Sequence, residues 1–158
     1  MKYLLNLLIV IGLSKGGWTQ PSKTIPAFQF TTLDGLVFKQ TDLPAGKMTF
    51  FIYMETDCEH CQRAVEYVNR HYQEFKKVSV YLVSMNSPAR INQFINQFGK
   101  TLARQKNVVV LQDTRYDFIS QFKPWKSPGM FLYSVDKKLL LYGDNEKKIS
   151  EFIKRIKA

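Results

Sequence analysis

The sequence predicts an α/β fold in which a central mixed β-sheet is flanked by helices and carries an added N-terminal β-hairpin. Two observations lead to this prediction. Strand-like and helix-like segments alternate along the chain, and a buried-strand pattern leads through a polar turn into a helix pattern. With 158 residues, 45% of them hydrophobic, the chain can bury a sizeable core. No repeat or linker divides residues 21–158, so they are expected to form one domain.

The first predicted elements are two strands joined by a tight turn. Residues Ala27–Thr31 alternate apolar and polar side chains, as a half-buried strand does. Asp34-Gly35 is a turn signal and Leu36–Lys39 returns, which predicts a β-hairpin. Met48–Met54 is a nearly continuous apolar run, which is typical of a central strand buried on both faces.

A long amphipathic helix is predicted after this strand. Thr56 or Asp57 is expected to cap its N-terminus, and apolar residues recur at helical spacing as far as Phe75. The remaining strands are expected at Val78–Val83, Val108–Leu111, Met130–Val135 and Leu139–Tyr142. The remaining helices are expected at Pro88–Phe98, Tyr116–Phe122 and Glu146–Ile156. Because a helix joins the first two core strands, these strands are expected to be parallel.

The N-terminus has the pattern of an export signal. Lys2 supplies a positive charge, Tyr3–Leu13 is mostly apolar, and Ser14–Gly17 is polar and small. About eleven apolar positions suit a signal peptide better than a membrane span. Residues 1–20 are therefore predicted to be a signal peptide, with cleavage and retention as a membrane anchor both left open. Export predicts a periplasmic or otherwise extracytoplasmic location in a bacterium, where disulfides can persist.

The chain is basic, with a net charge of +10 at pH 7. Removal of residues 1–20 takes away Lys2 and Lys15 and lowers this charge to +8. The basic residues are scattered in short groups, which favours solvated helix and turn faces over a concentrated binding patch. No nucleic-acid partner is expected of an exported protein with this pattern.

The chain has two cysteines, Cys58 and Cys61, at the junction between the buried strand and the long helix. A structural zinc site would need four ligands, and only His60 and His71 remain to complete one. A purely structural disulfide would close a loop of about four residues and gain little. A copper site that uses both sulfurs is chemically possible. The favoured interpretation is a redox dithiol whose first sulfur is stabilised as a thiolate by the helix N-terminus.

These motifs resemble the thioredoxin superfamily, and specifically its exported TlpA/ResA-like branch. The resemblance rests on the Asp34-Gly35 hairpin, Gly46-Lys47 before the apolar strand, the Cys58-x-x-Cys61 pair, and Ser127–Tyr133 followed by Asp136-Lys137. It implies a thioredoxin-like fold, thiol–disulfide exchange and no bound cofactor or metal. The implied partners are protein thiols or disulfides and a redox partner. Membrane contact is expected only through the N-terminal segment, if that segment is uncleaved.

The resemblance also implies roles for individual residues. Cys58 would be the nucleophile and Cys61 the resolving thiol, and the two would form the redox-active disulfide. Pro128 is expected to follow a cis peptide bond, to lie against the dithiol and, together with Ser127, to bind an extended substrate.

The chain departs from the usual thioredoxin pattern at several positions beside the cysteines. Asp57 stands where tryptophan is usual before the first cysteine, and His60 stands where proline is usual before the second. Ile52 occupies the place of the buried carboxylate, which leaves Glu55 or Asp57 as alternative proton acceptors.

Two residues between the cysteines are expected to tune the dithiol. A His60 imidazolium would favour the thiolate and make the disulfide more oxidising, in the direction of the DsbA oxidases, whereas Glu59 would oppose this. The direction of electron transfer, reductase or oxidase, is left open.

The Cys58-x-x-Cys61 pair also allows other functions. A copper-binding module like the Sco proteins is an alternative, although those have a Cys-x-x-x-Cys-Pro spacing and a distant histidine that this chain lacks. A non-catalytic thioredoxin-like binding domain with a vestigial dithiol is another. A peroxidase is disfavoured because the chain has no Pro-x-x-x-Thr-x-x-Cys motif.

Overall fold

The computed structural model describes residues 20–158, so most of the predicted signal peptide lies outside the described residues. The strands are β1 (Gln29–Thr32), β2 (Val37–Lys39), β3 (Thr49–Tyr53), β4 (Ser79–Ser84), β5 (Val108–Gln112), β6 (Gly129–Tyr133) and β7 (Leu139–Gly143). The helices are α1 (Glu59–Arg70), α2 (Pro88–Phe98) and α3 (Ile149–Lys157). Short helical turns are η1 (Gln40–Asp42), η2 (Tyr72–Phe75), η3 (Leu102–Arg104), η4 (Phe118–Phe122) and η5 (Glu146–Lys148).

The strands of this region form one mixed sheet in the order β2-β1-β5-β4-β3-β6-β7. The central strands β3, β4 and β5 are parallel, and β1–β2, β1–β5, β3–β6 and β6–β7 are antiparallel. The predicted N-terminal hairpin is confirmed, and it extends the sheet beyond β5. Right-handed crossovers from β3 to β4 and from β4 to β5 move in the same direction, so they place α1 and α2 on the same face.

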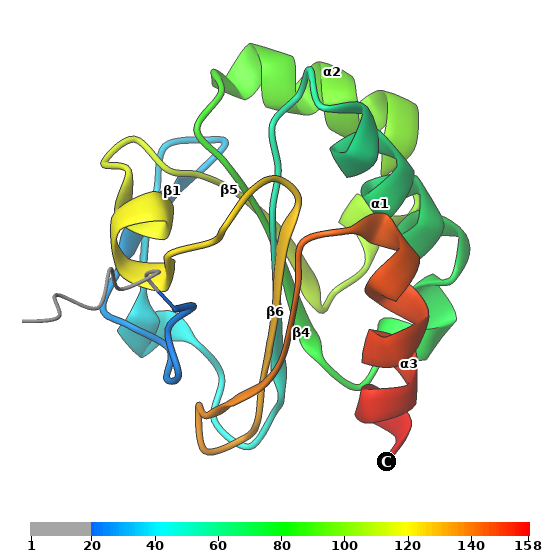
Figure 1. Ribbon diagram of the computed structural model, residues 1–158. Helices are drawn as coiled ribbons and strands as arrows, with labels where there is room; N and C mark the ends of the chain where they lie inside the picture. The colour runs from blue at the N-terminus through cyan, green and yellow to red at the C-terminus, as the bar shows by residue number, and fades with distance from the viewer. Residues whose placement is uncertain (1–19) are drawn as a thin grey trace, which may run out of the picture.

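Strand β3 is buried on both faces, as its continuous apolar sequence predicts. Phe50 and Ile52 point into the core beneath the helices, whereas Phe51 and Tyr53 point into a second core on the opposite face. This alternation is the two-residue period of a strand. Figure 1 shows the three long helices gathered on one side of the sheet and η4 with the first described residues on the other.

Aromatic rings fill the second core. Phe118 and Phe122 of η4 stack with their centroids 4.3 Å apart, and Tyr53 stacks on Phe118 at 5.0 Å. Phe28, from the segment before β1, packs edge-on against Phe51 at 5.8 Å. Offset and edge-to-face pairs of this kind add to the apolar burial of each ring.

Three predicted helices are shorter in the structure than their apolar patterns suggest. The helix expected at Glu146–Ile156 begins with the tight turn η5 and is α-helical only from Ile149. Helix α1 ends at Arg70, because His71 leaves helical geometry, and the chain continues as the tight turn η2. Phe75 still reaches the core and stacks on Phe50 at 5.4 Å, so the apolar spacing was correct although the helix was not continuous. The helix expected at Tyr116–Phe122 is the single π-helical turn η4. Within residues 20–158, we find no helix with the length and apolarity needed to cross a bilayer.

Candidate active site

The two cysteines lie where β3 passes through a short loop into α1. Cys58 is itself the N-cap of α1, which corrects the prediction that Thr56 or Asp57 would cap the helix. Its Sγ accepts a hydrogen bond from the backbone N–H of Cys61 at 3.2 Å. The first turn of a helix has N–H groups without partners inside the helix, and a sulfur can satisfy one of them as a capping oxygen does. The helix N-terminus therefore stabilises negative charge on Cys58.

The two thiols differ in access to solvent. Cys58 is partly exposed, whereas Cys61 is fully buried under α1. Burial raises the pKa of the Cys61 thiol far above its usual range, and the hydrogen bond with Cys58 raises it further. Cys61 therefore stays protonated near neutral pH, while Cys58 is the sulfur with access to solvent. The structure holds both cysteines as thiols, so the Cys58–Cys61 disulfide remains a prediction.

The loop before β6 lies against the dithiol. The Ser127–Pro128 peptide bond is cis, as expected from the resemblance, and Pro128 is buried. The Cys58 thiol donates to the Ser127 carbonyl at 3.8 Å. The register of the antiparallel pair β3–β6 sets Gly129, the next residue, opposite Tyr53 at the end of β3. Residues about 70 positions apart in sequence are thus neighbours at the site.

Glu55 and Asp57, the alternative proton acceptors, have different surroundings. The Ser127 hydroxyl donates to the Glu55 carboxylate at 2.8 Å, which ties Glu55 to the loop beside the dithiol. Asp57 instead forms an ion pair with Arg90 in the first turn of α2. Ile52 is buried in the core beneath the helices, so the usual position of the buried carboxylate is apolar here. Glu55 is therefore the carboxylate better placed to exchange protons at the dithiol.

His60 belongs to a charge network that joins α1 to η5. Its Nδ1 lies 3.0 Å from the Glu146 carboxylate and 3.0 Å from an Arg63 guanidinium nitrogen. Arg63 Nε donates to the other Glu146 oxygen at 3.0 Å, and Arg63 also pairs with Glu59 at 3.3 Å. The Glu146 carboxylate therefore contacts the His60 ring, whose positive charge was expected to act on the Cys58 thiolate. The tuning roles of His60 and Glu59 remain predictions.

The electrostatics of Glu146 follow from these contacts. Burial acts to raise the pKa of Glu146, but hydrogen bonds from its own backbone N–H, Arg63 and His60 outweigh it and hold the pKa below the usual range. Glu146 is thus a carboxylate at neutral pH. Glu146 was not among the residues singled out from the sequence. It lies 86 positions after His60, and nothing in the sequence indicates that the two side chains meet.

A second polar group missed from the sequence fixes the loop ahead of Cys58. The Asn86 side-chain oxygen accepts from the Thr56 N–H at 3.0 Å and from the Ser84 hydroxyl at 3.0 Å. Asn86 follows β4, so the end of one parallel strand holds the loop that follows its neighbour.

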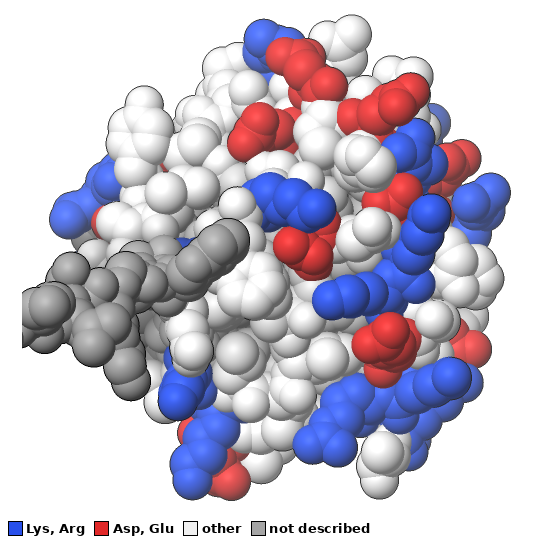
Figure 2. Space-filling model, viewed as in Figure 1, with Lys and Arg blue, Asp and Glu red and all other residues white. Residues whose placement is uncertain are grey.

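The described residues do not gather the ligands of a metal site. Within residues 20–158 no group of three or more histidine, cysteine or acidic side chains could hold a metal ion. His71 lies at the C-terminal end of α1, where its Nδ1 bonds the Tyr67 carbonyl at 2.8 Å. Figure 2 shows basic side chains interspersed with acidic ones over one face of the molecule.

A partly exposed helix-capping thiol, a buried thiol one turn later and a cis-proline loop on a mixed sheet define a thioredoxin-like dithiol protein. The AhpC/TSA family model matches residues 21–151, and the chain belongs to that family. It is 26% identical over 143 residues to the thiol-disulfide oxidoreductase ResA of Bacillus thuringiensis (strain Al Hakam). That alignment covers 87% of this chain and 79% of the relative, and the ResA of Bacillus anthracis matches equally well.

Solved structures show the same fold. A secreted disulfide oxidoreductase of Mycobacterium tuberculosis, homologous to Escherichia coli DsbE, superposes with a TM-score of 0.65 at 17% identity, covering 81% of this chain and 95% of that one. Copper-bound ScoI of Arabidopsis thaliana superposes with a TM-score of 0.63 at 13% identity, covering 86% and 99%. At these identities the likeness concerns the fold alone.

Proposed function

We propose that this chain is an extracytoplasmic thiol–disulfide oxidoreductase that exchanges electrons with protein disulfides through Cys58 and Cys61. The single observation that carries the proposal is the asymmetry of the two sulfurs. Cys58 caps α1 and is partly exposed. Cys61 is buried and protonated, and its backbone N–H donates to the Cys58 sulfur. The relatives named thiol-disulfide oxidoreductases and the predicted export signal support the activity and the location.

The first step is attack by Cys58. Its thiolate displaces one sulfur of a substrate disulfide, which leaves as a thiolate and takes a proton from solvent. A mixed disulfide joins Cys58 to the second substrate sulfur. The helix N-terminus favours the attacking anion. The Cys58 thiol, which donates to the Ser127 carbonyl at 3.8 Å, releases its proton to solvent when that anion forms.

The second step is resolution by Cys61. Its thiol loses a proton, its sulfur attacks Cys58 Sγ, and the second substrate thiolate leaves as the Cys58–Cys61 disulfide forms. Two electrons have then passed from the dithiol to the substrate, and the same steps in reverse oxidise a substrate. We assign the Cys61 proton to Glu55, because Glu55 is fixed beside the dithiol by Ser127.

The substrate is proposed to lie against the loop that contains Ser127 and Pro128. This loop meets the partly exposed Cys58 through the Ser127 carbonyl, and it leads directly into β6. An extended chain laid along the backbone edge beside Pro128 would present its disulfide to Cys58.

The activity is tested with a disulfide-bonded protein substrate and a thiol electron donor. The wild-type chain is expected to turn over, and Cys58→Ser is expected to abolish turnover. Retention of turnover by Cys58→Ser would overturn the proposal. Titration of the reduced protein with Cu(I) tests the copper alternative, since tight binding without thiol–disulfide exchange would favour that alternative instead.

A further inference from the structure

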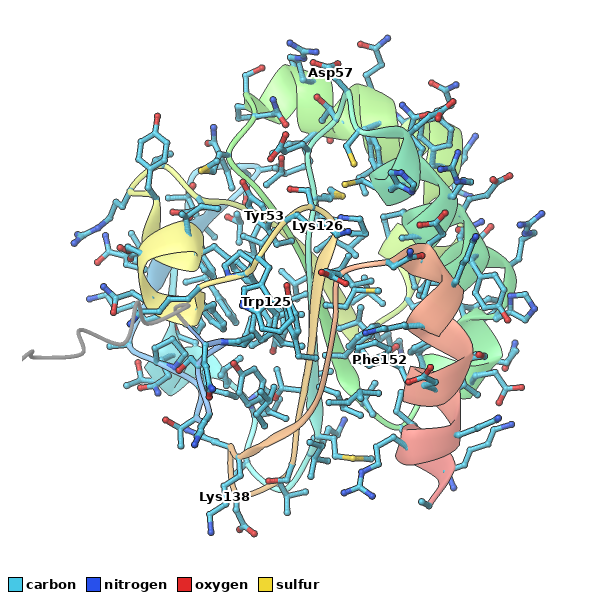
Figure 3. All side chains as sticks on the ribbon, in the orientation of Figure 1. Tyr53, Asp57, Trp125, Lys126, Lys138 and Phe152 are labelled. Carbon is cyan, nitrogen blue, oxygen red and sulfur yellow. The ribbon has the colours of Figure 1, made fainter. Side chains whose placement is uncertain are left out.

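A groove between α1 and α2 opens beside the dithiol and has no role in the steps above. Its volume is about 300 Å³. Its polar lining comes from the loop before Cys58, from α1 and from α2: Thr56, Asp57, Gln62, Arg90, Gln93 and Gln97. We call it the amide groove. Figure 3 places Asp57 at the end of the molecule where α2 runs past the start of α1.

One wall of the amide groove is a single face of α2. Arg90, Gln93 and Gln97 are three and four residues apart, so their side chains lie one above another along the helix. At about 1.5 Å of rise per residue this row spans about 10 Å, the length of about three residues of extended chain. The opposite wall includes Gln62, which directly follows the buried Cys61.

The lining matches the chemistry of a peptide backbone. The Asp57 carboxylate is neutralised by its ion pair with Arg90, which leaves the lining without net charge. Each glutamine carboxamide offers N–H donors and a carbonyl acceptor, the same groups that a main-chain amide presents. A neutral lining of this kind suits an extended polypeptide and gives no preference to a phosphate or another multiply charged anion.

Thr56 lines the groove from the loop before Cys58. The Thr56 hydroxyl is buried and has no hydrogen-bond partner among the described residues, although its backbone N–H is held by Asn86. Thr56 lies two residues before Cys58, and an occupant that reached it would be next to the nucleophile.

The lining also offers an apolar surface between the polar groups. Phe94 is buried and Phe98 is half-buried, and both line the groove on the α2 side. An extended peptide points alternate side chains to opposite sides, so its main chain can bond the glutamines while one side chain packs on the half-buried Phe98 ring.

We propose that the amide groove binds the main chain of an extended segment of the protein substrate, adjacent to the disulfide that Cys58 attacks. The proposal rests on the proposed function and names a second substrate-binding surface for it, distinct from the loop of Ser127 and Pro128.

The test compares two substrates with the double variant Gln93→Ala/Gln97→Ala. Both side chains are exposed and alanine favours helices, so α2 is expected to stay folded. We compare the kcat/KM for a disulfide-bonded protein with the kcat/KM for uncharged 2,2′-dithiodipyridine. The ratio of the first to the second is expected to fall about tenfold in the double variant, which corresponds to the loss of one or two net hydrogen bonds. The control Gln121→Ala removes an exposed glutamine from η4, outside the groove, and is expected to keep the wild-type ratio.

Four other outcomes would overturn the proposal. Unchanged kcat/KM values with both disulfides would show that the groove does not bind the substrate. An equal loss with both disulfides would show that the variant acts on the dithiol, and a selective loss with the small disulfide would assign the groove to low-molecular-weight thiols. If the wild-type chain turned over neither disulfide, the proposed function itself would fail, and the groove proposal with it.

A readout independent of turnover uses the Cys61→Ser variant joined to a cysteine-containing peptide through Cys58. The side-chain amide NMR signals of Gln93 and Gln97 are expected to shift on attachment of the peptide, and those of Gln121 are not. Shifts absent from Gln93 and Gln97 in this covalent complex would contradict the proposal.

Discussion

Substitution of Gly129 by alanine is predicted to displace the loop that holds Ser127 against Cys58. A Cβ at position 129 would lie 2.8 Å from the Pro124 Cβ, whereas ordinary contacts begin at 3.4 Å. The gap must therefore open by about 0.6 Å, and overpacking of this kind costs about 1–3 kcal/mol. Strand β6 cannot easily yield, because Gly129 pairs with Tyr53 of the central strand β3. The proline ring is rigid, so the loop of residues 124–127 has to move.

The assay combines urea denaturation with turnover of a protein disulfide. Gly129→Ala is expected to lower the unfolding free energy by about 1–3 kcal/mol. It is also expected to reduce turnover more than a variant that loses similar stability away from the site. Ile156→Val serves as the control, because it trims the core under α3 away from the site at a cost of about 1 kcal/mol. Equal turnover in the two variants, or no loss of stability in Gly129→Ala, would show that the loop of residues 124–127 does not have to move.

Three further predictions concern the charge network and the core. Because the folded pKa of Glu146 is lowered, the stability it contributes is present above the ordinary glutamate pKa of about 4.3 and is lost as the pH falls through its folded value. The difference in urea midpoint between wild type and Glu146→Gln should therefore be seen at pH 7 and shrink as the pH falls below the ordinary glutamate pKa, and a constant difference would contradict this. His60→Ala should lower the reduction potential of the dithiol by about 30 mV, measured against a glutathione buffer, and an unchanged potential would make His60 a spectator. Phe118→Ala should cost about 3–5 kcal/mol in urea denaturation, because its buried ring stacks on Phe122 and Tyr53, and a loss under 1 kcal/mol would show that the second core relaxes around it.

Local patterns in the sequence were sufficient to predict most of the fold. The period-2 and continuous apolar runs located the strands, and Asp34-Gly35 located the hairpin turn, where Gly35 has a φ of 91°. The end of α1 was misplaced, because Phe75 keeps helical spacing through a tight turn that the apolar pattern cannot distinguish from a helix. The covering of the second core by η4 depends on long-range packing that a seven-residue apolar segment does not reveal.

The candidate site was predictable only along the chain. Cys58 and Cys61 stand together in the sequence, and the loop of Ser127 and Pro128 was found through the family resemblance. The contacts of Glu55 with Ser127 and of His60 with Glu146 join residues 72 and 86 positions apart. Single-residue reasoning about side-chain charge could not show that His60 faces a carboxylate, because the packing of η5 against α1 decides that geometry.

Trapping of a mixed disulfide can show whether Cys58 attacks and Cys61 resolves. Reduced Cys61→Ser and Cys58→Ser variants are each mixed with a disulfide-bonded protein substrate, quenched with acid and weighed by intact-mass spectrometry. We expect Cys61→Ser to accumulate a mixed disulfide through Cys58, while the buried thiol left in Cys58→Ser forms almost none. Accumulation in Cys58→Ser but not in Cys61→Ser would show that the roles of the two cysteines are reversed.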